Sequence, residues 1–291
     1  MNPVSLGDVR SFWHEHDRHP SRRLGQNFLV DANIIRLIIE AAALTRDDLV
    51  LEVGPGLGSL TQALLQHAGR VVAVEKDRLL YEHLRDNFEL DSRLTLVRGD
   101  MLKTDHRALV GKDEFKLVSN LPYSCGTAIL VRIMQSDQRP ALMVVTMQLE
   151  VAQRLVAEPG TADYGLLSLW RGLDYEAQIS KVIAPGCFWP PPQVKSAVIA
   201  MIRRKCLHDF DRDFFFCLTK QAFGCRRKQL PTVLRQGSLL RGLPPGTVPE
   251  ILKKLEIDPK ARAEDLDVAA WLALAGALQT AVKSARARGK Y

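Results

Sequence analysis

The sequence predicts an α/β protein: a doubly wound, mostly parallel sheet with an antiparallel end, followed by a small all-α domain. Three observations support this fold class. From about residue 34, short apolar runs alternate with segments of helical periodicity. The runs are apolar on both faces, as in strands that helices cover from two sides. After Arg204 the pattern is helical only.

The elements of the sheet domain follow one another in a regular order. A first helix begins near Asp31 or Asn33, either of which can cap it, and turns a stripe of isoleucines to one side. The candidate strands are Leu49–Val53, Val71–Glu75, Leu94–Arg98, Leu117–Asn120 and Leu142–Thr146. Helical segments near Leu60–His67, Leu79–Asn87, Ala128–Met134 and Glu150–Ala157 separate them. This alternation predicts parallel strands joined by crossover helices.

Two later apolar stretches, Ala177–Ile183 and Ala197–Ile202, have no clear helix between them. Their connection, from Pro185 to Pro192, is rich in proline and aromatic residues. A direct connection without a crossover helix favours an antiparallel pair. We therefore expect these two strands to end the sheet.

The last third of the chain predicts helices. One amphipathic helix is expected around Phe214 to Phe223, and others near Pro249–Leu255 and Val268–Thr280. The predicted organisation is a flexible leader at 1–21, a sheet domain at 22–204, a helical domain at 205–282 and a basic tail at 283–291.

Composition and charge are those of a globular protein with one basic region. The net charge is +7, and residues 203–291 alone contain 18 Lys/Arg against 9 Asp/Glu, which favours contact with a polyanion. No apolar stretch approaches the length of a membrane span and no targeting signal is evident, so we expect a cytoplasmic location. Neither the five cysteines nor the cluster His14, His16 and His19 predicts a metal site.

A glycine loop and two acidic residues predict a nucleoside-cofactor site. The strand Leu49–Val53 leads into Gly54-Pro55-Gly56-Leu57-Gly58 and then a helix, so backbone can approach a ligand closely. Glu75 ends the next strand, where it can bind ribose hydroxyls, and Asp100 ends the third, where it can accept from an adenine amino group. The loop lacks the G-x-G-x-x-G spacing of a pyrophosphate cradle, which disfavours a nicotinamide dehydrogenase and favours S-adenosylmethionine.

The tetrapeptide Asn120-Leu121-Pro122-Tyr123 follows the fourth strand. An amide oxygen and a backbone carbonyl can hold the two N–H groups of an exocyclic amine, and the tyrosine ring can stack on a base. These residue types predict methylation of a nucleobase amine. Taken alone, the motif is more simply explained by a turn residue and a core aromatic.

Several ordered blocks resemble the small-subunit rRNA adenine dimethyltransferases, the KsgA/RsmA family. The blocks are Leu24-Gly25-Gln26-Asn27-Phe28-Leu29, Glu52-Val53-Gly54-Pro55-Gly56, Asn120-Leu121-Pro122-Tyr123, Glu150-Val151-Ala152-Gln153-Arg154-Leu155, Tyr164-Gly165-Leu166-Leu167-Ser168, Phe188 with Pro190-Pro191-Pro192-Gln193-Val194-Lys195-Ser196-Ala197-Val198, and Ala222-Phe223 before Arg226-Arg227-Lys228. The resemblance implies the Rossmann-like fold of S-adenosylmethionine-dependent methyltransferases. It also implies dimethylation of two adjacent adenines of 16S rRNA during ribosome biogenesis, without a metal. We expect a monomer.

The resemblance implies a cofactor pocket formed by Asn27, Leu29, Gly54, Gly56, Glu75, Asp100 and Asn120. It implies a catalytic group formed by Asn120, Leu121, Pro122, Tyr123 and Phe188. In that group the Asn120 side-chain oxygen and a carbonyl at Leu121 or Pro122 would hold the target amine. Tyr123 would stack under the adenine and Phe188 would cover its other face.

The implied partner is small-subunit rRNA or the assembling small subunit, with Arg226, Arg227 and Lys228 on its phosphates. The chain has Ser124-Cys125-Gly126-Thr127 where the family usually has Asn-Ile-Ser-Thr, which alters the wall beside the base. Two alternatives remain open at this stage. One is a large-subunit rRNA adenine methyltransferase of the antibiotic-resistance type, and the other is a ribosome-assembly factor without catalysis.

Overall fold

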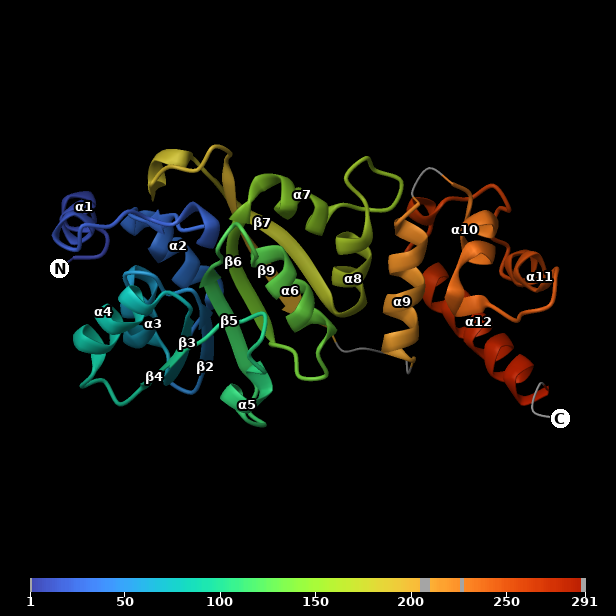
Figure 1. Ribbon diagram of the computed structural model, residues 1–291, viewed down its shortest axis with the longest axis horizontal. Coiled ribbons are helices and arrows are strands. Elements are labelled where there is room, and N and C mark those ends of the chain that lie inside the picture. Colours follow the sequence, from blue (N-terminus) through green and yellow to red (C-terminus); the bar gives the residue numbers. More distant parts are fainter. Residues whose placement is uncertain (1, 205–209, 226–227, 289–291) are drawn as a thin grey trace. The chain divides into compact units, whose positions relative to one another are not determined.

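The computed structural model describes residues 2–204, 210–225 and 228–288. Two compact units divide the chain: Met1–Gln153 with Tyr175–Arg203, and Arg154–Asp174 with Arg204–Tyr291 (Figure 1). The segment Arg154–Asp174, which lies before the last two strands in sequence, thus belongs with the C-terminal helices. The first unit contains the sheet and the second is helical.

A seven-stranded sheet forms the first unit. Its strand order is β4-β3-β2-β5-β6-β9-β7. The strands are β2 Leu49–Val53, β3 Arg70–Glu75, β4 Leu94–Arg98, β5 Phe115–Asn120, β6 Leu142–Gln148, β7 Tyr175–Ile183 and β9 Ser196–Arg203. β9 pairs antiparallel with both β6 and β7, whereas β2 to β6 are parallel. The predicted fold class and its antiparallel end are therefore confirmed.

The first unit also contains helices that bury apolar side chains. They are α1 Leu6–Glu15, α2 Ala32–Ala42, α3 Ser59–His67, α4 Arg78–Phe88, α5 His106–Val110, α6 Gly126–Gln135 and the start of α7 Leu149–Val156. α2 begins at the Asp31 cap, whose side chain accepts from two backbone N–H groups. Its isoleucines share one core cluster with α3 leucines and with valines of β2, β3, β5, β6 and β9. This packing holds the parallel strands in register, so their carboxyl ends meet at one edge.

A two-stranded ribbon joins distant segments of the first unit. β1 Phe28–Leu29 pairs antiparallel with β8 Phe188–Trp189, in the proline-rich connection. One-turn 3₁₀ helices at Arg22–Leu24 and Pro185–Cys187 precede the two strands. The pairing fixes the segment before α2 beside the connection to the sheet's antiparallel end.

The second unit is built from helices. Beyond the end of α7 they are α8 Leu166–Asp174, α9 Arg212–Phe223, α10 Leu230–Gln236, α11 Thr247–Lys254 and α12 Val268–Arg288, with 3₁₀ turns at Ser238–Leu240 and Ala263–Asp265. A buried ion pair joins Arg212 to Asp174 within this unit. Trp271, on α12, is fully buried and its indole N–H donates to the Ala263 carbonyl.

Both ends of the chain differ from the sequence expectation. The leader contains α1, whose Val9, Phe12 and Trp13 are buried, so 1–21 is not a flexible tail. At the other end α12 continues to Arg288, into the segment expected to be a tail. Over Val268–Ala287 this helix is also long and apolar enough to cross a membrane by length and composition, contrary to our expectation. Trp271 of this helix is fully buried in the helical unit.

Candidate active site

The glycine loop after β2 forms the floor of the site. Gly54, Gly56 and Gly58 have φ of 67°, 63° and 86°, a left-handed backbone that favours glycine. A Cβ added to Gly56 would lie 3.0 Å from the ring of Phe28, so the loop and β1 are in close contact. α3 begins at Ser59, which directs the positive end of its dipole toward the loop.

Glu75, at the end of β3, faces this loop. Its carboxylate accepts from the backbone N–H groups of Gly56, at 3.1 Å, and Asp77, at 2.8 Å. The side chain is 5% exposed, and burial raises the pKa of Glu75 to about 7. Two N–H donors fix the carboxylate while its remaining lone pairs can still accept ligand hydroxyls.

Glu52 is a second buried acid of the site and stands in the motif Glu52-Val53-Gly54-Pro55-Gly56, but the sequence predicted no role for it. It lies on β2, is 1% exposed and accepts a hydrogen bond from Thr61 Oγ1 at 2.7 Å. Burial raises the pKa of Glu52 to about 8, and the neighbouring charge of Glu75 adds to the shift. The signal in the sequence was an acid inside a strand that is otherwise apolar on both faces.

The protonation of Glu52 predicts a pH-dependent stability. Its folded pKa lies above the ordinary value, so the neutral form's stabilisation is present at low pH and is lost as pH rises toward and through about 8. Glu52→Gln keeps an oxygen that can accept from Thr61 and removes the titration. We expect the variant's melting temperature to fall less than that of the wild type between pH 6 and 9. Parallel slopes in calorimetric melts over this range would contradict the assignment.

Asp100 follows β4 and pairs with Lys76 at 2.9 Å. The Lys76 ammonium holds the pKa of Asp100 below its usual range. The other carboxylate oxygen accepts from the Leu102 N–H at 3.0 Å, which forms a tight turn after the strand. Asp100 therefore stands as a charged acceptor at the edge of the site.

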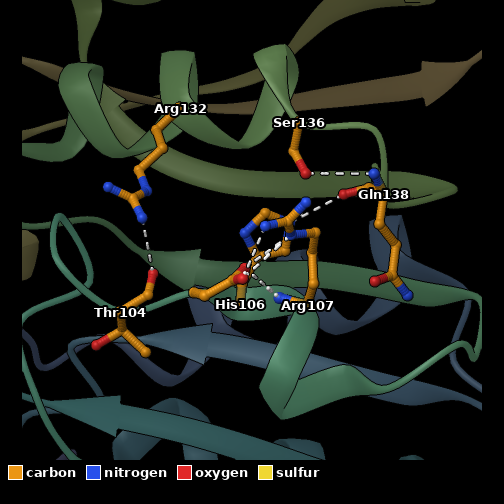
Figure 2. A network of polar contacts seen from close by, with 7 residues as sticks. Thr104, His106, Arg107, Arg132, Ser136 and Gln138 are labelled. Atoms are coloured by element: carbon orange, nitrogen blue, oxygen red, sulfur yellow. Dashed lines mark hydrogen bonds and ion pairs between the residues drawn. The ribbon is translucent and has the colours of Figure 1, made fainter.

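Arg132 holds the Asp100 turn from α6, the helix that follows the tetrapeptide. Its guanidinium donates to the carbonyls of Leu102 and Thr104, the latter at 3.3 Å. Figure 2 shows this side chain reaching Thr104 from the helix, apart from His106, whose ring nitrogen contacts the Gln138 carbonyl. One arginine thus connects the turn that carries Asp100 to the helix that follows the tetrapeptide.

We expect Arg132→Ala to weaken cofactor binding about threefold, because the loss of charge-assisted bonds to two carbonyls loosens the turn that carries Asp100. Isothermal titration calorimetry measures the change. Arg107→Ala is the matched control, since Arg107 is also exposed but its side chain pairs with Asp105. Equal affinities for the Arg132 variant and wild type would contradict the role of this clamp.

The predicted cofactor residues meet around one cavity of about 250 Å³. Its lining includes Asn27, Leu29, Gly54, Gly56, Glu75, Asp100, Asn120, Leu121 and Pro122, together with Glu52. A nucleoside cofactor without phosphates fits this donor set, because the cavity offers buried carboxylate acceptors and a close glycine backbone. Tyr123 and Phe188 are not among the lining residues. Among the described residues, no group of three or more His, Cys, Asp or Glu could hold a metal.

Of the two polar atoms of the Asn120 side-chain amide, one has a hydrogen-bond partner in the described part of the chain and the other has none. Its Nδ2 donates to the backbone carbonyl of Asn27 at 3.0 Å, which orients the side chain and ties it to the segment before β1. Its Oδ1 is buried and has no hydrogen-bond partner in the described part of the chain. Because a buried acceptor without a partner costs roughly 1–3 kcal/mol, the site is prepared for a donor.

The two backbone carbonyls of the tetrapeptide are not equivalent. Pro122 O already accepts from the N–H groups of Cys125, at 3.2 Å, and Gly126, at 2.7 Å. These bonds close the turn into α6. The geometry therefore favours the Leu121 carbonyl over that of Pro122 as a second acceptor for a ligand.

Tyr123 and Phe188 lie beside each other outside the cavity lining. Their ring centroids are 6.3 Å apart in an edge-on arrangement, and the Tyr123 hydroxyl hydrogen-bonds to Ser196. Phe188 is 2% exposed and belongs to the core cluster under α2. In this structure the Phe188 ring packs in the core beside Tyr123, and its strand β8 pairs with β1.

The predicted RNA-contacting residues are only partly described. Arg226 and Arg227 lie outside the described residues. Lys228 is exposed, and its Nζ lies 3.4 Å from Gln236 Oε1 in the second unit. The four cysteines described, Cys125, Cys187, Cys217 and Cys225, are free thiols.

The sheet order, the glycine loop after β2 and the acids at the ends of β3 and β4 define an S-adenosylmethionine-dependent methyltransferase. A family model described as ribosomal RNA adenine dimethylase matches residues 19–280. The chain therefore belongs to the ribosomal RNA adenine dimethylase family.

Curated relatives match nearly the whole chain. The ribosomal RNA small subunit methyltransferase A of Pelotomaculum thermopropionicum is 41% identical over 92% of this chain and 94% of its own. The ribosomal RNA small subunit methyltransferase A of Moorella thermoacetica is 39% identical over 89% of this chain and 93% of its own. Among solved structures, a dimethyladenosine transferase from Plasmodium falciparum superposes with a TM-score of 0.73 at 23% identity, over 84% of this chain and 94% of its own. The 23S rRNA methyltransferase ErmE superposes with a TM-score of 0.63 at 26% identity, over 87% of this chain and 100% of its own.

Proposed function

We propose that the chain is an S-adenosylmethionine-dependent enzyme that dimethylates N6 of two adjacent adenines in 16S rRNA, as part of ribosome biogenesis in the cytoplasm. The observation that carries this proposal is the buried, unpartnered Oδ1 of Asn120 at the cavity edge. An exocyclic adenine amine supplies the N–H donor that this atom lacks. Full-length likeness to small subunit methyltransferases A supports the choice of RNA.

The residues hold the amine and orient it. Asn120 Oδ1 and the Leu121 carbonyl accept its two N–H groups, which draws the nitrogen lone pair out of conjugation with the ring. Tyr123 stacks on the base from the turn. Asn120 Nδ2, fixed on the Asn27 carbonyl, keeps the acceptor in place during the reaction. Positioning of this kind can supply a large part of a rate enhancement.

The cofactor is held by residues of the cavity. Glu75 accepts from ribose hydroxyls, Asp100 accepts from the adenine amino group, and the backbone of Gly54 and Gly56 allows close approach. When bound, S-adenosylmethionine supplies an electrophilic methyl group. Asn27 and Leu29 cover it and exclude water. The basic residues of the second unit, with Arg226, Arg227 and Lys228 among them, bind rRNA phosphates, and the enzyme acts as a monomer on rRNA or on the assembling small subunit.

Mass spectrometry of adenosines tests the proposal. Small-subunit particles and bare large-subunit rRNA are each incubated with the protein and S-adenosylmethionine. We expect dimethyladenosine at two adjacent positions of the small-subunit RNA. Methylation of large-subunit rRNA alone would favour the resistance-type enzyme, and particle binding without any methylation would favour an assembly factor.

A further inference from the structure

Helix α1 is a packed element of the first unit that the site described above does not use. Its buried face consists of Val9, Phe12 and Trp13, which are 0%, 5% and 3% exposed. Their spacing of three and four residues puts them on one side of the helix. None of the residues of α1 lines the cofactor cavity. The helix therefore affects the cavity only through the residues on which it packs.

Those residues come from three elements around the cavity. Val9, Phe12 and Trp13 share one apolar cluster with Phe28, Leu57 and Leu80. Phe28 belongs to β1, Leu57 stands in the glycine loop, and Leu80 is in the first turn of α4. Phe28 and Leu80 also line the cavity. A single layer of side chains thus separates α1 from the ligand site.

The contact between Trp13 and Phe28 is well placed to transmit a displacement. The two ring centroids are 5.6 Å apart. On its other side the Phe28 ring lies so close to Gly56 that a Cβ there would be 3.0 Å away. Because protein interiors are close-packed, Phe28 cannot shift without moving either the loop or Trp13.

Polar contacts hold the segment between α1 and β1 on the same wall. Gln26 Oε1 accepts from the Ser21 N–H at 2.6 Å, and its Nε2 donates to Asp77 at 3.0 Å. The Asp77 N–H in turn donates to Glu75, the ribose-binding acid. The chain that leaves α1 is thus fixed to the group that orients Glu75.

Trp13 packs against its neighbours, but its side chain makes no hydrogen bond within the described part of the chain. Its indole N–H is buried and has no partner in the described part of the chain. A buried donor without a partner disfavours tryptophan, so phenylalanine should replace it with little loss if ring packing is its role. This separates packing from hydrogen bonding by a conservative substitution.

We propose that α1 is a positioning element for the cofactor pocket: Trp13, seated on Phe28, holds β1 and the glycine loop in their binding geometry. The inference rests on the proposed function for the identity of the cofactor. It predicts that affinity for the cofactor depends on Trp13, a residue that does not line the cofactor cavity. Affinity for RNA should not depend on Trp13.

Calorimetric titration of S-adenosylmethionine into the full chain is the test. We expect Trp13→Ala to weaken binding about tenfold, within the usual range of coupling between distinct sites. Trp13→Phe should bind within about twofold of the wild type. Arg10→Ala, an exposed position of the same helix, is the matched control and should bind unchanged. Titrations are made well below each variant's melting temperature, so that a loss of stability alone leaves affinity unaffected.

A milder variant and a second readout cover the case in which Trp13→Ala does not fold. Val9→Ala removes two methyl groups from the same cluster and should weaken binding about twofold to threefold, because a small cavity only partly relaxes the wall. By linkage, saturating cofactor should also slow hydrogen exchange of the α1 amides in the wild type.

The outcomes separate the two proposals. If the wild type binds no S-adenosylmethionine, the proposed function fails. If the wild type binds it but Trp13→Ala or Val9→Ala binds equally well, or α1 exchange is unchanged by cofactor, the role of α1 is overturned.

Discussion

Asn120→Ala is expected to lower kcat for adenine methylation by about 10²–10³-fold, the usual cost of removing one preorganised polar group that acts on the reacting atoms. The side chain is already oriented by its bond to the Asn27 carbonyl, and its Oδ1 is free for the substrate. Its loss leaves the target amine with one acceptor and a conjugated lone pair. Single-turnover transfer of radiolabelled methyl groups into small-subunit particles measures the effect.

Binding controls distinguish this loss from a general defect. Filter binding of particles should be unchanged in Asn120→Ala, because phosphate contacts carry affinity for RNA. Asn87→Ala, which removes an exposed amide on α4 outside the cavity lining, is the matched control and should keep nearly full activity. A kcat within about tenfold of the wild type would remove Asn120 from the reaction, since acceptor groups of this kind cost more.

The residues at strand ends were predictable from the sequence. Glu75, Asp100 and Asn120 each follow an apolar run, and the carboxyl ends of parallel strands meet at one edge of a sheet. The cavity brings all three together with the glycine loop. Local patterns were sufficient there because the alternation of strands and helices dictates the topology.

Other parts of the site depend on contacts distant in sequence. The edge-on placement of Phe188 follows from β8 pairing with β1, about 160 residues earlier, which no local pattern announces. α1 was missed for a different reason. Its Val9, Phe12 and Trp13 carry helical spacing, but a single apolar stripe in a polar leader predicts burial only when its partners are known. The Pro122 carbonyl already accepts two backbone hydrogen bonds, and this likewise depends on how the turn enters α6.

Gly25→Ala is expected to lower kcat about a hundredfold, the effect of a displacement of about 1 Å near reacting groups. Gly25 precedes the Asn27 carbonyl that orients Asn120, and it packs directly on the turn after the tetrapeptide. An added Cβ would lie 2.6 Å from the Ser124 backbone N and 2.9 Å from that of Tyr123. Neither is the end of a flexible side chain, so the turn that carries Tyr123 must move.

Gly111→Ala provides the control. Gly25 and Gly111 have nearly equal φ of 67° and 66°, but ψ is 31° at Gly25 and −138° at Gly111, so alanine is strained at both and at least as much at Gly111. Nothing lies within 4 Å of a Cβ at Gly111. Both variants should therefore lose stability in thermal melts, but only Gly25→Ala should lose single-turnover activity. Equal activity in the two variants would show that the turn tolerates displacement, and the contact between Gly25 and the turn would then have no part in positioning the base.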